Sequence, residues 1–126
     1  MAQQALSDTY THWLLGSAHS YLGQSMAPQA ITLLELLCAL QPDNQQALRM
    51  LVYAYLLAAR YQRVLETATL LAQLDQTNRE QLAYLSLLRA RALWGFGKTE
   101  ASKDEFQKYI GLVSTLKSVR DDRKNG

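Results

Sequence analysis

Apolar residues recur along this chain at spacings of three and four, which is the period of an amphipathic helix. The first predicted helix runs from about Thr9 to Gly23, and Ser7 or Asp8 can cap it by accepting from a free backbone amide. One side of this helix is expected to be buried, and it consists of Trp13, Leu14, Ser17, Ala18 and Tyr21.

A second predicted helix, from Pro28 to Leu40, lies within a stretch that the chain repeats. Proline is tolerated in a first helical turn, whereas Pro42 cannot continue a helix. The segment Leu37 to Asn44 reads LCALQPDN, and about 34 residues later Leu71 to Asn78 reads LAQLDQTN. The chain therefore repeats a helical pair with a period of about 34 residues.

The same spacing predicts two further pairs. In the second pair, Asp43 or Asn44 caps a helix, the turn is Ala59-Arg60-Tyr61, and the next helix runs from Gln62 to Leu74. Its expected buried positions are Leu48, Leu51, Val52 and Tyr55. The third pair, capped by Asn78, comprises helices from about Arg79 to Trp94 and from Glu100 to Val119 around a turn at Gly95 to Lys98. The last helix is expected to bury Ala101, Phe106, Tyr109, Ile110 and Val113.

Helical pairs with this period are typical of tetratricopeptide repeats. The predicted fold is all-α, with three tandem repeats at 11–44, 45–78 and 83–116 that form a short superhelix with a concave groove. We expect one domain over residues 1–119 and a flexible tail over 120–126. Small residues at Ala30 and Ala90 are expected where two helices approach closely.

Composition and charge narrow the possible functions. The chain has 126 residues, 48% of them hydrophobic, and only two prolines, as expected for one folded domain. Its net charge of +2 arises in residues 113–126, so the neutral remainder argues against nucleic-acid binding. No apolar run suffices for a membrane span, and the N-terminus has no signal-peptide pattern. Cys38 is the single cysteine, and a reducing cytoplasm is expected.

Candidate chemical sites are weak. Gly97 to Thr99 looks like the end of a phosphate-binding loop, but Ala92 stands where a glycine is required and no strand precedes it. His12 and His19 lie about 10 Å apart along one helix, too far to share a metal ion unaided. Asp104 and Glu105 lie among lysines, as on a solvated helix face. We therefore expect no catalytic, cofactor-binding or metal-binding residues and no enzyme activity.

The informative surface is the predicted groove. In a stacked array the first helix of each pair lines the concave side, at the second, fifth, ninth and twelfth positions of each repeat. These positions hold His12, Leu15, His19 and Leu22, then Gln46, Arg49, Tyr53 and Leu56, then Tyr84, Leu87, Arg91 and Trp94. Exposed aromatic and aliphatic side chains beside arginine are typical of interfaces, and such a groove suits an amphipathic helix or an extended peptide. The alternative is that some of them are core residues.

Residues 11–116 resemble the tetratricopeptide family, and more narrowly the three-repeat chaperones of bacterial type III secretion of the YscY (SctY) type. Three segments carry the resemblance: AITLLELLCALQPDN from Ala30, LLRARALWGFG with Arg89-Ala90, Leu93 and Gly95, and FQKYIGL with Phe106-Gln107, Tyr109-Ile110 and Leu112.

This resemblance implies a cytoplasmic bacterial chaperone without a cofactor. Such a chaperone would keep a small exported protein, YscX-like or SctX-like, soluble in its groove and help to deliver it to the export gate of the secretion apparatus. A homodimer is possible when no client is bound. Two alternatives remain: a sister chaperone for translocator or needle subunits, and a repeat adaptor in a non-secretory assembly.

Overall fold

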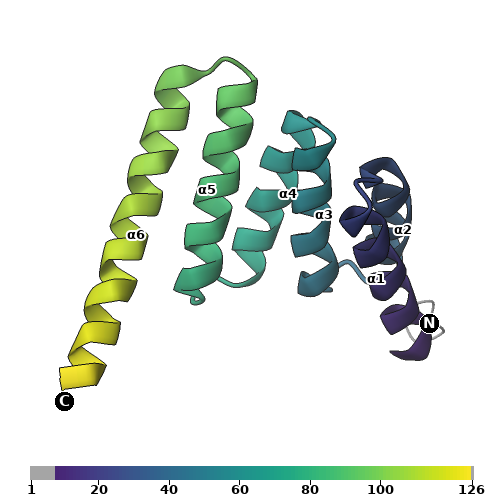
Figure 1. The fold of residues 1–126 in the computed structure, drawn as a ribbon, viewed down its shortest axis with the longest axis horizontal. Coiled ribbons are helices and arrows are strands. Elements are labelled where there is room, and N and C mark those ends of the chain that lie inside the picture. Colours follow the sequence, from purple (N-terminus) through teal and green to yellow (C-terminus); the bar gives the residue numbers. More distant parts are fainter. Residues whose placement is uncertain (1–7, 126) are drawn as a thin grey trace.

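The chain is a row of six helices in a computed structural model, which describes residues 8–125 and the side chains of residues 8–118. The helices stand side by side in a single curved row (Figure 1). They are α1 (Asp8–Gly23), α2 (Ala27–Leu40), α3 (Gln45–Leu57), α4 (Tyr61–Leu74), α5 (Arg79–Gly95) and α6 (Thr99–Asn125). No strand occurs among residues 8–125, so the predicted all-α class is confirmed.

The helix boundaries agree closely with the sequence pattern, except at the C-terminus. The predicted ends of α1, α2, α4 and α5 are each within one residue of the observed ends. The last helix continues beyond Val119 to Asn125, so the segment expected to be a tail is helical up to that residue. Ser7, one of the two predicted caps of α1, lies outside the described residues.

All three pairs turn in the same way. Ser25, Ala59 and Gly97 follow α1, α3 and α5, and each has a positive φ, of 61°, 58° and 79°. After each of them a backbone N–H closes a six-residue ring: Met26 N–H donates to the Tyr21 carbonyl at 2.8 Å, Arg60 N–H to Tyr55 at 2.9 Å, and Lys98 N–H to Leu93 at 2.9 Å. This left-handed helix end is the Schellman motif. It reverses the chain at one end of the array (Figure 1).

The helices that follow the first two pairs also begin in the same way. Asn44 and Asn78 stand 34 positions apart, and each accepts a hydrogen bond at its side-chain oxygen. The donors are the backbone N–H groups of Ala47 and Gln81, both at 3.0 Å. The predicted caps at Asn44 and Asn78 are confirmed, and the period in the sequence corresponds to a period in the backbone.

Each helix packs against the next along the chain, and α3 also contacts α1 and α5. The predicted buried positions of the second pair are all buried: Leu48, Leu51, Val52 and Tyr55. Ala30 and Ala90 are 0% and 4% exposed, as expected for sites of close approach. Trp13 was expected to be buried but is 63% exposed, because it lies on a side of α1 that no described helix covers.

The expected buried stripe of the last helix is wrong. Phe106, Ile110 and Val113 are 44%, 42% and 38% exposed, Ala101 is also exposed, and only Tyr109 is half-buried. The helix α6 packs mainly against α5, so its other sides have no helix to bury them. The single buried side chain of α6 within residues 99–118 is Ser102, whose hydroxyl donates to the Ala90 carbonyl at 2.7 Å.

Candidate partner-binding groove

Three adjoining hollows run along α1, α3, α5 and α6, and together they are called the groove here. One hollow of about 480 Å³ lies between α1, α3 and the start of α5. A second, of about 470 Å³, lies between α5 and α6. A third, of about 460 Å³, lies near the turns and reaches from the end of α3 to the start of α6. The second hollow shares Tyr84 with the first and Leu87 with the third, so the three adjoin one another.

The hollow near α1 combines apolar and basic side chains from three helices. Tyr53 of α3 and Tyr84 of α5 are 39% and 38% exposed, so much of each ring is available to a ligand. The residues that line this hollow are His19, Leu22, Gly23, Arg49, Met50, Tyr53 and Tyr84. Burial raises the pKa of the Tyr84 hydroxyl. The neighbouring Tyr53 raises this pKa further, whereas Arg91 lowers it. Tyr53, Tyr84 and Arg91 are therefore close enough to interact electrostatically.

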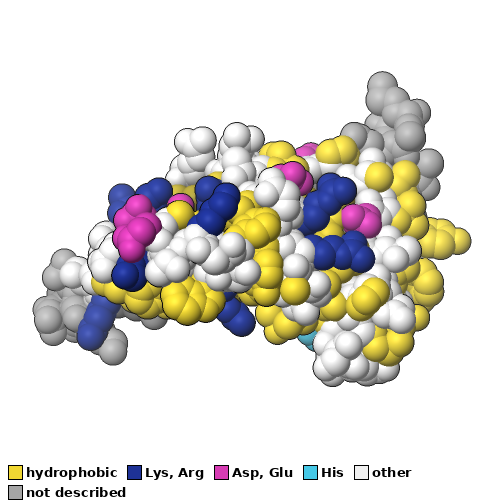
Figure 2. Space-filling model, turned by 90° about the horizontal axis from the view of Figure 1, so that it is seen from above, with side chains coloured by type: hydrophobic (Ala, Val, Ile, Leu, Met, Phe, Trp, Pro, Cys, Tyr) yellow, Lys and Arg dark blue, Asp and Glu magenta, His cyan; other side chains and the backbone are white. Residues whose placement is uncertain are grey.

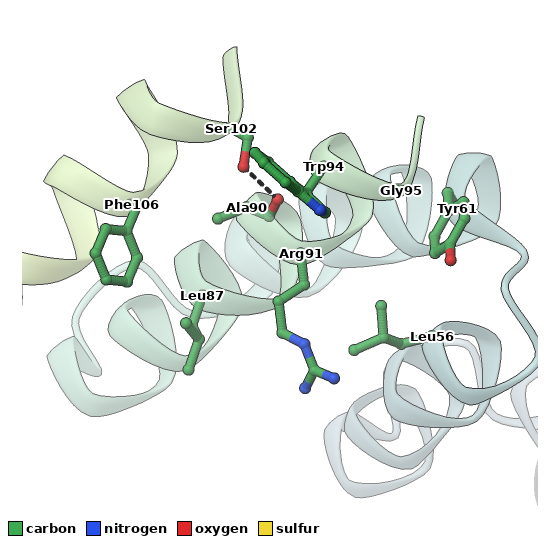
Figure 3. A pocket seen from close by; sticks show the side chains of 9 residues that line it. All are labelled: Leu56, Tyr61, Leu87, Ala90, Arg91, Trp94, Gly95, Ser102 and Phe106. Carbon is green, nitrogen blue, oxygen red and sulfur yellow. Dashed lines mark hydrogen bonds between the residues drawn. The ribbon is translucent and has the colours of Figure 1, made fainter. Parts of the chain in front are cut away.

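The hollow near the turns is dominated by α5. Arg91 extends between Leu87 and Leu56, and Trp94 projects from the next turn of the helix (Figure 3). Trp94 is 66% exposed, the highest exposure among the large hydrophobic side chains of residues 8–118. Phe106 closes the side formed by α6 (Figure 3). A large aromatic ring left uncovered beside a fixed apolar hollow is a typical anchor point for a partner.

Gly95 and Tyr61 close the far edge of this hollow. A Cβ atom at position 95 would lie 2.5 Å from Cε2 of the Tyr61 ring, so only glycine allows the ring to lie this close to the backbone of α5. The same ring packs edge-on against Phe96, with centroids 5.8 Å apart. The start of α4 is thereby held against the end of α5.

Nine of the twelve predicted groove residues line these hollows. They are His19, Leu22, Arg49, Tyr53, Leu56, Tyr84, Leu87, Arg91 and Trp94. Leu56 does so as a core residue, since it is only 8% exposed. Leu15 is 7% exposed and belongs to the core, so its expected exposure is wrong. His12 and Gln46 are exposed but line none of the three hollows.

The sequence pattern missed the contribution of α6 to the groove. Phe106, Tyr109 and Val113 recur at helical spacing, and this spacing was interpreted as a buried stripe. In the structure these side chains line the second and third hollows, together with Leu116 and Lys117. A periodic apolar stripe indicates a helix face that becomes buried. The same pattern results whether another helix of the chain or a separate partner buries that face.

The surface around the groove is partly apolar and carries positive charge. Viewed from the end that carries the three turns, hydrophobic side chains reach the surface between Lys and Arg side chains (Figure 2). Arg49, Arg91 and Lys117 line the groove, with Glu80 as the acidic side chain in its lining. The groove therefore offers an apolar surface with an excess of cations.

Other candidate chemistry is placed away from this surface. Gly97 and Lys98 form the α5–α6 turn, and the Lys98 ammonium lies 5.5 Å from the centre of the Phe96 ring. Within residues 8–118, no group of three or more His, Cys, Asp or Glu side chains lies close enough to hold a metal ion. Burial, with a smaller contribution from Glu35, raises the pKa of the Cys38 thiol to about 11, which disfavours the reactive thiolate.

Comparisons with known proteins do not assign the chain to a family. No protein-family model matches it, and no curated protein sequence matches it. Among residues 8–125, no helix is both long enough and apolar enough to cross a lipid bilayer.

Proposed function

We propose that this protein is a cytoplasmic tetratricopeptide-repeat chaperone of bacterial type III secretion. It holds a helical segment of a small exported protein, YscX-like or SctX-like, in its groove and helps to deliver it to the export gate. The observation that carries the proposal is the row of exposed aromatic rings at Tyr53, Tyr84 and Trp94, set among leucines along the three adjoining hollows of the groove. The resemblance of three segments to such chaperones supports the secretion context.

The repetition of the fold supports the tetratricopeptide assignment. The segments α2 and α4 each have 14 residues and begin 34 positions apart, at Ala27 and Tyr61. Identical asparagine caps and identical left-handed turns recur with them. Stacked helical pairs of this kind present an extended surface whose shape follows from the repeat itself.

Binding in this groove needs no nucleotide. Covering apolar surface contributes about 25 cal/mol per Å² before the costs of ordering and association are subtracted. An exported segment that cannot fold alone would present its apolar side to the groove and be kept from aggregating. Release at the export gate would then follow from competition for the same apolar side of the segment.

Affinity capture from the native bacterium tests this proposal. The captured complex is analysed by mass spectrometry and by multi-angle light scattering, and the partner is then sought in the culture medium under secreting conditions. We expect one small partner at a fixed stoichiometry that is exported only when this chaperone is present. A translocator or needle subunit would indicate a sister chaperone instead. A partner that is never exported would overturn the proposal in favour of a repeat adaptor.

A further inference from the structure

Among residues 8–118, the groove cations Arg49, Arg91 and Lys117 form no ion pair with a carboxylate. Arg91 makes no hydrogen bond or ion pair with any of the described residues. Arg49 donates from Nη1 to the amide oxygen of Gln81 at 3.0 Å, which is a neutral acceptor. Lys117 likewise has no carboxylate within ion-pair distance among residues 8–118. The described part of the chain therefore places cations along an apolar surface without pairing them with its own carboxylates.

Elsewhere on the molecule, carboxylates are available and are used. Ion pairs join Arg63 to Glu66 on α4, at 3.8 Å, and Arg89 of α5 to Glu105 of α6, at 3.7 Å. Further pairs on α6 join Lys103 to Glu100 and Lys108 to Glu105. None of these side chains lines the groove. Glu80 also lines the groove, but none of the ion pairs among residues 8–118 includes Arg49, Arg91 or Lys117, so the unpaired cations are a local feature of the groove.

Arg49 is held in place before any partner arrives. Gln81 is only 5% exposed and lies at the first turn of α5, where Asn78 caps the helix through the Gln81 backbone N–H. Its side-chain oxygen accepts from Arg49 across the gap between α3 and α5. A guanidinium has five N–H donors, so one such contact orients the group and leaves other donors for a ligand. A charge that is already oriented loses less entropy on binding.

We infer that the groove selects an amphipathic helix whose apolar stripe is flanked by carboxylates that pair with Arg49 and Arg91. This inference rests on the proposed function, in which the groove covers a helical segment of a partner. The aromatic and leucine side chains take the apolar stripe. The two arginines then set the register and direction of the helix, because carboxylates pair strongly with guanidinium groups and like charges are excluded.

A single-stranded nucleic acid is the other ligand with affinity for aromatic rings and arginines. Such ligands carry a phosphate at every nucleotide and need a continuous track of cations. The groove instead separates Arg49, Arg91 and Lys117 by leucine, valine and aromatic side chains. The chain as a whole carries only +2. The acidic amphipathic helix therefore fits the groove better.

Defined peptides test this inference on the full chain. The probe is a fluorescein-labelled, helix-forming peptide of about five turns with leucine along one face and glutamate on both flanks. Two twins carry glutamine or lysine in place of glutamate, and an oligothymidylate of similar length is the nucleic-acid probe. Fluorescence anisotropy is measured with the wild type, Arg49→Gln and Arg91→Gln. The matched control is Arg63→Gln, which removes an arginine outside the groove.

We expect the glutamate peptide to bind about tenfold more tightly than the lysine peptide, with a difference that shrinks as salt is added. Each groove substitution should weaken the glutamate peptide about two- to fivefold and leave the glutamine peptide unchanged, while Arg63→Gln changes neither.

Equal affinity for the three peptides would overturn the charge selection and leave the proposed groove intact. Tighter binding of the oligothymidylate than of the glutamate peptide would overturn the inference in favour of a nucleic-acid ligand. If none of the probes bound, both the inference and the proposed use of the groove for a helical segment would be contradicted.

Discussion

The Tyr55 hydroxyl donates a hydrogen bond to the Glu35 carboxylate at 2.5 Å, and this bond joins α3 to α2. The Tyr55 ring is 3% exposed and sits in the core between the first two pairs. Because the bond connects consecutive pairs, it stabilises the stacking of the array as well as the core.

Tyr55→Phe should destabilise the fold by about 1–2 kcal/mol, because it removes a hydrogen bond to a charged acceptor and keeps the ring. The measurement is urea unfolding followed by circular dichroism. Tyr53→Phe is the matched control, since Tyr53 is 39% exposed and makes no hydrogen bond within residues 8–118. Equal stability of both variants and the wild type would show that the bond contributes nothing.

Stability should fall at alkaline pH through two neighbouring groups. Burial raises the pKa of Cys38 from 9.0 to about 11, and burial and the bond to Glu35 raise the pKa of Tyr55 above its usual value of 10.0. The folded chain thus holds both protons more tightly than the unfolded chain. Their contribution is complete below about pH 8.5 and is lost as the pH rises towards 11 and beyond.

Urea midpoints measured at intervals from about pH 7 to pH 11 check this pH dependence. The decline above pH 9 should be shallower in Cys38→Ala and in Tyr55→Phe, because each variant lacks one of the two titrating groups. A profile that both substitutions left unchanged would contradict the assignment to these groups.

Glycine should stabilise the two turns that lack it. Ala59 has a φ of 58°, which is unfavourable for a residue with a Cβ atom. Ala59→Gly should therefore stabilise the fold by about 0.5–1 kcal/mol, and Gly97→Ala should destabilise it by a similar amount. The control is Ala58→Gly, where φ is −85° and glycine only adds freedom to the unfolded chain. Thermal unfolding would contradict this account if Ala59→Gly lowered the melting temperature as Ala58→Gly does.

The close approach of helices at Ala30 and Ala90 should not tolerate a larger side chain. Leucine at either position should destabilise by about 1–3 kcal/mol through overpacking. Ala39→Leu is the control, because Ala39 is an exposed residue of α2. Chemical unfolding of the three variants gives the comparison, and neutral results at Ala30 and Ala90 would contradict the packing described here.

The sequence predicted four helices, α1, α2, α4 and α5, to within one residue because caps and turns are local. An asparagine before a helix and a left-handed residue after one act through neighbouring backbone groups, so the pattern near Asn44 and Asn78 suffices. The period of about 34 residues then located equivalent positions, such as Tyr55, in the core.

Burial at the edges of the array could not be predicted in the same way. Trp13 and Phe106 belong to apolar faces of α1 and α6, but those faces are only partly covered by described helices. Leu15 was predicted to line the groove, but it is buried. The orientation of α1 against α2 and α3 decides which residues of α1 face outward. Such outcomes depend on long-range packing, which local periodicity does not contain.

The central claim is that a partner binds at the groove, and truncation of Trp94 tests it most directly. The affinity of the captured partner and the melting temperature are measured together for Trp94→Ala and for Trp13→Ala. The two tryptophans are 66% and 63% exposed, and Trp13 lies outside the groove. We predict that Trp94→Ala weakens binding about tenfold or more at an unchanged melting temperature, and that Trp13→Ala keeps full affinity. Undiminished binding by Trp94→Ala, or a loss of affinity that only follows a loss of stability, would contradict the account.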